Sequence, residues 1–174
     1  MRIALACAKR ASRSSQEAHL TFRIRGLDPA PFRHLYGLSD SELAEHGVRR
    51  VTADSKPGFP DRIGMRDVEA GETLLLLNYT HQAAETPFKA CHAIFIREGA
   101  EAVYDRIDEI PDVLHVRTIS LRAFDEAGMM RDADLASGNA IEPAIEKLLA
   151  DPKNAYLHAH YAKMGCFAAH IERA

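Results

Sequence analysis

Four consecutive leucines, Leu74–Leu77, restrict the fold of this chain more than any other segment. The run follows Gly71 and precedes Asn78-Tyr79-Thr80, a setting that favours a short strand over a segment of buried helix. We therefore predict a strand from Thr73 to Tyr79. A strand whose side chains are apolar on both faces must be covered on both faces, so we expect it to lie centrally in a sheet.

Six further segments have the alternating or short apolar pattern of strands and are bounded by turn residues. They are Leu20–Arg25, Val48–Ala53, Lys89–Arg97, Val116–Phe124, Ala155–Tyr161 and Gly165–Glu172. The last two are separated only by Ala162-Lys163-Met164, which predicts a C-terminal β-hairpin.

Two helices are indicated by local signals. Ser39 and Glu42 have the spacing of a capping box, which predicts a helix from about Asp40 to His46. A second helix is predicted by apolar residues spaced as one helix face. These residues are Ile141, Ile145, Leu148 and Leu149.

A third, short amphipathic segment is predicted between two strands, because Val103 and Ile107 have helical spacing and Pro111 closes the segment. Strands and helices do not alternate along the chain, which excludes a doubly wound α/β fold. We expect a single α+β domain over residues 19–174. It has a mainly antiparallel sheet, open or curled into a barrel-like form, and two or three helices. Residues 1–18 are expected to form a disordered extension.

Composition excludes several classes of protein. A hydrophobic content of 47% with a net charge of -3 excludes a disordered chain, and no apolar run approaches the ~20 residues of a membrane-spanning helix. The basic excess in residues 1–50 is too small for a nucleic-acid binder. Three cysteines do not form a disulfide scaffold, which favours a reducing compartment. We expect a cytoplasmic protein with a small-molecule ligand and no nucleic-acid or membrane partner. The sequence leaves open whether the protein is a monomer or a homodimer.

His158 and His160 lie on the same side of one predicted strand, because side chains alternate with period two. Two imidazoles at this spacing are able to bind one metal ion, and zinc would be the first choice. A third ligand would have to come from elsewhere in the chain: His81, His92, Cys91 or Cys166. Histidines hydrogen-bonded in the interior are the alternative.

The register of the C-terminal hairpin decides where these rings point. With Lys163-Met164 as a two-residue turn, His160 pairs with Phe167. Ala169 and Ile171 would then share the face of the histidines, which would place polar rings on a mostly apolar surface. This arrangement would suit a pocket or a core position.

Two other groups of side chains are candidates for ligand binding. One follows the leucine strand, as a binding loop or as a polar turn, and consists of Asn78, Tyr79, His81 and Gln82. The other consists of Ser120 and Arg122 on one strand face, which would suit an anionic group or be an ordinary solvated face. If the protein is an enzyme, the candidates for general acid/base catalysis are His81, His158 and His160.

The sequence has no G-x-G-x-x-G, Walker, H-E-x-x-H, G-x-S-x-G or C-x-x-C motif. Three classes of function stay open. They are a small-molecule-binding domain that is an enzyme or a binder, a metal-binding protein, and a non-catalytic interaction or stress-related module.

Several short motifs occur along the chain: Gly58-Phe59-Pro60, Asn78-Tyr79-x-His81-Gln82, Ser120-Leu121-Arg122-Ala123-Phe124, Gly128-Met129-Met130, His158-x-His160 and Gly165-Cys166-Phe167-Ala168. In this order they make the chain resemble domain-of-unknown-function family 1203, which consists of small bacterial proteins. The resemblance covers about Leu20 to Arg173. It implies a single bacterial cytoplasmic domain but no catalytic residue, since the family has no established reaction. Asp61 and Tyr161 stand where the family often has cysteine and asparagine.

Overall fold

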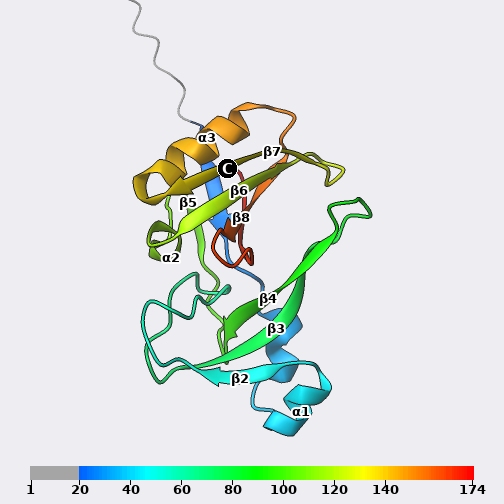
Figure 1. Ribbon diagram of the computed structural model, residues 1–174, viewed down its shortest axis with the longest axis vertical. Helices are drawn as coiled ribbons and strands as arrows, with labels where there is room; N and C mark the ends of the chain where they lie inside the picture. The colour runs from blue at the N-terminus through cyan, green and yellow to red at the C-terminus, as the bar shows by residue number, and fades with distance from the viewer. Residues whose placement is uncertain (1–19) are drawn as a thin grey trace, which may run out of the picture.

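The computed structural model describes residues 20–174, so the extension expected over residues 1–18 lies outside the described part. Two antiparallel sheets form the fold (Figure 1). The large sheet has the strand order β5-β1-β9-β8-β6-β7, and the small sheet has the order β2-β3-β4. The strands are β1 (Phe22–Arg25), β2 (Arg49–Thr52), β3 (Thr73–Gln82), β4 (Ala90–Arg97), β5 (Asp105–Ile107), β6 (Thr118–Phe124), β7 (Met130–Ser137), β8 (Tyr156–Tyr161) and β9 (Phe167–Arg173).

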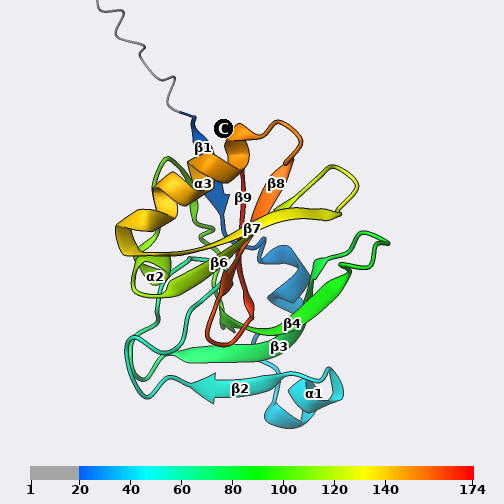
Figure 2. The ribbon, with the colours of Figure 1, turned by 45° about the horizontal axis from the view of Figure 1, so that its top comes forward.

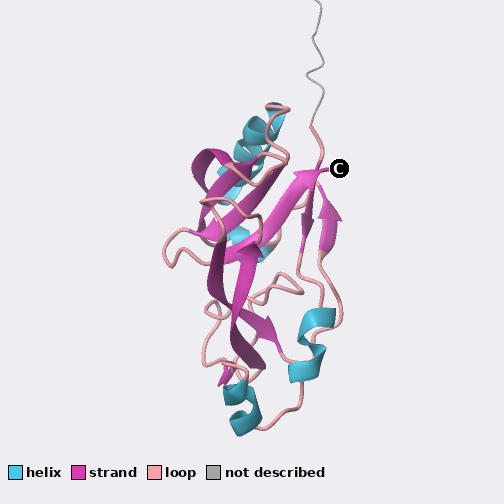
Figure 3. Ribbon diagram, turned by 90° about the vertical axis from the view of Figure 1, so that its right-hand side faces the viewer, coloured by secondary structure: helices cyan, strands magenta, loops and turns pink. Residues whose placement is uncertain are grey.

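The helices are short and lie at the outside of the sheets. They are η1 (Ala30–Leu35), α1 (Asp40–Glu45), α2 (Asp112–His115), η2 (Gly138–Ala140) and α3 (Ile141–Ala150). The predicted capping box of α1 is present: the Ser39 hydroxyl accepts from the Glu42 amide, and the Glu42 carboxylate accepts from the Ser39 amide. Helix α3 crosses the large sheet at one end of the molecule, and α1 lies at the other (Figures 2 and 3). None of the helices in residues 20–174 has the length and apolarity needed to cross a membrane.

Each sheet has its own apolar core. The predicted stripe of α3 is buried against the large sheet, where Leu121 and Leu157 are also fully buried. On the small sheet, η1 and α1 cover β3 and β4, and Leu75 is fully buried there. These features confirm the α+β class, the central position of β3 in its sheet and the C-terminal hairpin. Neither sheet closes into a barrel.

One predicted helix is absent, and one strand of the large sheet was not predicted. The segment with Val103 and Ile107 does not form a helix, because β5 pairs with β1 at the edge of the large sheet, where Arg23 and Asp105 form an ion pair with N···O 2.5 Å. The helix α2 begins only after Pro111. Strand β7 was not predicted at all, because its side chains are almost all exposed and give no apolar alternation.

The polar segment after the leucines is also placed differently from the expectation. It is not a loop, because β3 continues through it to Gln82 and pairs with β4 from Leu74 to Gln82, with a register shift at His81. The side chains of Asn78 to Gln82 are therefore held by a strand pair that projects from the small sheet towards the large one (Figure 1).

The hairpin of β8 and β9 has the expected pairing of His160 with Phe167. A bulge at Ala168 then shifts the register, so that His158 pairs with His170. The expectation that Ala169 and Ile171 share the face of the histidines is therefore wrong. Ala169 lies opposite Ala159, and Ile171 lies opposite Leu157.

Several hydrogen bonds join the two sheets, and two of them mark the ends of the surface between the sheets. Arg62, which is 1% exposed, donates from Nε to the Phe167 carbonyl of β9 at 3.0 Å. At the other end, Thr86 in the turn between β3 and β4 donates to the Gly128 carbonyl in the turn between β6 and β7, at 3.2 Å. The surfaces of the two sheets that face each other between these contacts carry the candidate site.

A substitution at Gly26 tests the contact between the sheets at Arg62. A Cβ atom at Gly26 would lie 2.0 Å from the Ile63 carbonyl oxygen, next to Arg62. We expect Gly26→Ala to lower the free energy of unfolding by about 3 kcal/mol, because backbone must move. In the control Gly58→Ala, the added Cβ would lie 3.2 Å from the Ser55 hydroxyl and 3.5 Å from the Ser55 carbonyl oxygen, and the loss should be below about 0.5 kcal/mol. Equal urea midpoints for the two variants would contradict this.

Candidate functional site

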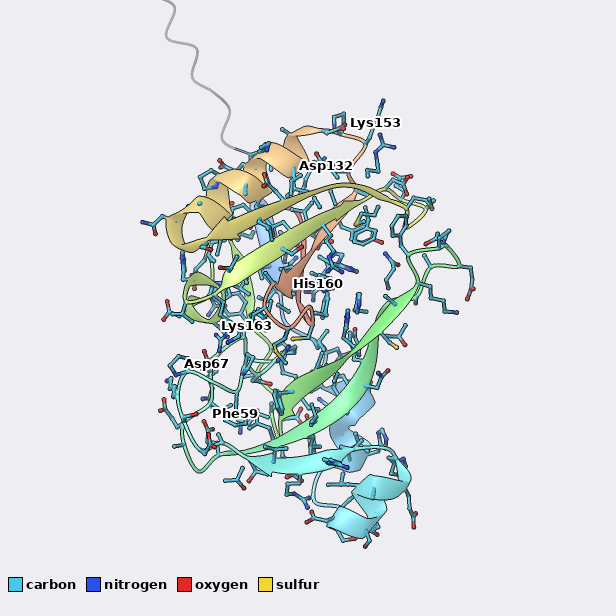
Figure 4. The ribbon with its side chains drawn as sticks, in the orientation of Figure 1. Phe59, Asp67, Asp132, Lys153, His160 and Lys163 are labelled. Atoms are coloured by element: carbon cyan, nitrogen blue, oxygen red, sulfur yellow. The ribbon has the colours of Figure 1, made fainter. Side chains whose placement is uncertain are left out.

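Five of the nine histidines meet between the two sheets. Figure 4 shows His160 between the large sheet and the β3–β4 strand pair. The five residues, called the histidine cluster below, are His81 on β3, His92 on β4, His158 and His160 on β8, and His170 on β9. Each ring has its centroid within 5.7 Å of another ring of the cluster. In the cluster, histidine rings of the small sheet therefore contact histidine rings of the large sheet.

His160 is the most deeply buried member of the cluster, with no exposed surface. Its Nδ1 lies 3.0 Å from the Gly165 carbonyl oxygen, which can only accept a hydrogen bond. The proton is therefore assigned to Nδ1, and Nε2 carries a free lone pair. Among residues 20–174, that Nε2 atom has no hydrogen-bond partner.

His81 is held between two parallel rings. Its ring centroid is 5.1 Å from that of His92 and 5.2 Å from that of Phe167, with interplanar angles of 3° and 7°. Its Nε2 lies 3.0 Å from Nδ1 of His92. One ring nitrogen from each of His81, His92 and His160 lies within 4.8 Å of the others, and these three are called the histidine trio below.

The buried rings are neutral at physiological pH. Burial lowers the pKa of His81 to about 4, of His160 to about 3 and of His158 to about 2. The neighbouring Arg122 guanidinium also lowers all three pKa values. A neutral imidazole is the form that binds a metal ion. A group with so low a pKa is poorly matched to proton transfer near pH 7.

Strand β6 brings the second predicted group beside the histidines. Ser120 pairs with His160, and Arg122 pairs with His158. No carboxylate of the described chain forms an ion pair with Arg122, which is half-buried. The cluster therefore has a cationic neighbour without an acidic partner.

Of the other predicted residues, Tyr79 and Gln82 contact the large sheet, whereas Asn78, Cys91 and Cys166 lie outside the trio. Tyr79 packs on Phe167 with centroids 5.9 Å apart, and the buried Gln82 donates to the Tyr156 hydroxyl at 2.7 Å. Asn78 is exposed and pairs with Ala93, so the structure does not bring it to the cluster. Two of the third-ligand candidates also lie outside the trio: Cys91, which is exposed, and Cys166.

His158 belongs to the cluster but not to the trio, so the predicted metal pair of His158 and His160 contributes only His160. His92 and His81, named as third-ligand candidates, supply the other two members. His170 was missed, because a hairpin without the bulge at Ala168 places it on the other face. No signal in the sequence indicates that bulge.

The comparisons with known proteins agree with the resemblance seen in the sequence. The family model described as "Protein of unknown function (DUF1203)" matches residues 58–173, which include all five residues of the histidine cluster. No curated protein and no solved structure matches the chain.

A substitution at His158 tests whether the buried histidines lower the free energy of unfolding. Its Nδ1 is buried without a hydrogen-bond partner in the described chain, and Phe124, Tyr156 and Phe167 surround the ring. We expect His158→Phe to leave the free energy of unfolding of chelator-treated protein unchanged or to raise it by up to about 1 kcal/mol, because a buried unsatisfied group is removed.

The matched control is Asn154→Leu, since the Asn154 amide donates to the Leu148 carbonyl at 2.8 Å and is also buried. It should lower the free energy of unfolding by about 1–3 kcal/mol, because a buried carbonyl loses its donor. A loss larger than about 1 kcal/mol in both His158→Phe and His158→Leu, by urea denaturation, would show that the ring stabilises the fold.

Proposed function

The chain belongs to the family described as "Protein of unknown function (DUF1203)", and we propose that it binds a divalent transition metal through the histidine trio, with zinc as the first choice. One observation carries the proposal. The buried Nε2 of His160 has no hydrogen-bond partner in residues 20–174 and lies within 4.8 Å of a nitrogen of His81 and one of His92. Leaving a buried acceptor unpaired costs about 1–3 kcal/mol, which a metal bond would offset.

The surroundings of the trio support metal binding. The Gly165 carbonyl fixes the tautomer of His160, as carbonyls commonly do for metal-bound histidines. Phe167 and the ring of His92 hold His81 in a fixed plane. Zinc ligands lie about 2.0–2.1 Å from the ion, so small ring rotations would bring three nitrogens now within 4.8 Å onto one ion.

Three histidines leave one coordination position open, as in catalytic zinc sites. A metal ion with an open position supplies a polarised oxygen or an activated water. In this chain, Arg122 would attract an anionic group to that position, and Ser120 would offer a hydroxyl beside it. The small-molecule ligand expected from the sequence is thus a ligand of the metal site in this proposal.

Histidine acid/base chemistry without a metal is less well supported, because burial holds the pKa values of His81 and His160 at about 4 and about 3. A general base should have a pKa near the working pH. A non-catalytic module would need no unpaired buried nitrogen at all.

The proposal predicts about one metal ion per chain in protein purified without a tag or chelator, measured by elemental analysis. His92→Ala and His160→Ala should each lower the metal content at least tenfold, because each removes one of three ligands. His115→Ala is the control, since His115 lies on α2 outside the cluster and should not change the metal content.

Circular dichroism must show that each variant is folded, and His92→Ala is the more tolerant position because His92 is only partly buried. Folded wild-type protein that neither contains metal nor binds added zinc below millimolar concentration would contradict the proposal. Metal retained by both trio variants would also contradict it.

A further inference from the structure

A cleft of about 830 Å³ opens beside the histidine cluster. It lies between the small sheet and the turn that joins β8 to β9, where Figure 4 labels Lys163. Its walls are mostly apolar and include Phe95, Val116 and Met164, of which the last two are strongly exposed. The volume falls in the range of sites for small organic molecules.

All the formal charges that line the cleft are positive. Arg62, Arg117 and Lys163 belong to its lining, and no aspartate or glutamate does. The whole chain is acidic, with a net charge of -3, so this lining departs from the composition of the chain. A one-sided charge in a concave site attracts ligands of the opposite charge.

Arg62 is the least compensated of these charges. It is 1% exposed, and its three hydrogen bonds go to the carbonyls of Phe167 and Pro60 and to the Cys166 sulfur. These bonds use three of the five N–H groups of a guanidinium. No carboxylate in residues 20–174 pairs with it, in contrast to Arg117, which Asp67 binds at 2.6 and 2.7 Å. A buried charge without a counter-ion is costly.

Tyr161 adds an unpaired donor to the same wall. The guanidinium carbons of Arg62 and Arg117 lie 4.9 Å and 5.1 Å from the centroid of its ring. The hydroxyl is buried and has no hydrogen-bond partner in the described chain. Burial raises the pKa of Tyr161 to about 12, so the group stays a donor at neutral pH.

We propose that this cleft binds a small organic carboxylate with an apolar body. The carboxylate lies against Arg62, Tyr161 and Lys163, and the apolar body packs on Phe95 and Met164. His92 belongs both to the cleft lining and to the trio, so the ligand lies next to the proposed metal site. The inference does not depend on the metal, because none of the groups that bind the carboxylate is a metal ligand.

The test is titration calorimetry on chelator-treated protein with hexanoate, benzoate and phenylacetate, each compared with its neutral amide. We expect at least one carboxylate to bind at least tenfold more tightly than its amide, because only the anion offsets the cations of the cleft. Inorganic phosphate, which lacks an apolar body, should bind more weakly than that carboxylate.

Two variants locate the binding. Lys163→Glu should weaken carboxylate binding at least tenfold, whereas Lys153→Glu makes the same charge change at an exposed lysine on the far side of the large sheet from the cleft (Figure 4) and should have no effect. Tyr161→Phe keeps the ring beside both guanidiniums and removes only the hydroxyl, and should weaken binding several-fold with an unchanged melting temperature.

Equal affinity for carboxylates and amides, or no binding of either at millimolar concentration, would overturn the proposal. Carboxylate binding that neither Lys163→Glu nor Tyr161→Phe changes would place the ligand elsewhere and overturn it too. Because metal content is measured separately, failure of the cleft and failure of the metal site are distinguishable.

Discussion

The arrangement of the site depends on one buried guanidinium. The Arg62 guanidinium donates to the Phe167 carbonyl of β9 and lies against the ring of Tyr161 at the end of β8. The backbone amide of Arg62 donates to the Phe95 carbonyl of β4. One residue therefore joins the strand pair of the small sheet to the hairpin of the large sheet. Because these two strand pairs face each other, histidines that are far apart in the sequence become neighbours. Gly26 permits the same junction, since a side chain there would collide with the backbone beside Arg62.

The surface between the sheets is built at the expense of stability. Ring nitrogens of His81, His158 and His160 and the hydroxyl of Tyr161 are buried without hydrogen-bond partners in the described chain. Apolar side chains would fill the same space without this cost. Proteins commonly break such rules at functional sites, which need polar groups held ready for a ligand. The proposed metal site would use the Nε2 of His160, and the proposed carboxylate ligand would pair with Arg62 and the hydroxyl of Tyr161. The Nδ1 of His158 lies outside the trio and is a candidate for replacement by an apolar side chain.

Local sequence signals predicted the elements whose stability is local. The capping box at Ser39 and the apolar stripe ending at Leu149 depend only on spacing, and both were confirmed. The edge strands β5 and β7 were not predicted, since edge strands have few buried residues to create a pattern. The alternation of side chains along a strand predicted that His158 and His160 lie on the same side of β8. The trio could not be predicted, because it depends on which strands of the two sheets face each other. His170 could not be predicted either, because its place depends on a one-residue bulge at Ala168.

The central claim is that His81, His92 and His160 form one metal site. Anomalous diffraction at the metal absorption edge, from crystals of protein purified without chelator, tests it most directly. The account predicts one peak between β3, β4 and β8, about 2.0–2.1 Å from a ring nitrogen of each of the three histidines. A well-ordered structure with His81 and His92 still hydrogen-bonded to each other and no peak beside them would contradict it, as would a peak held by other residues.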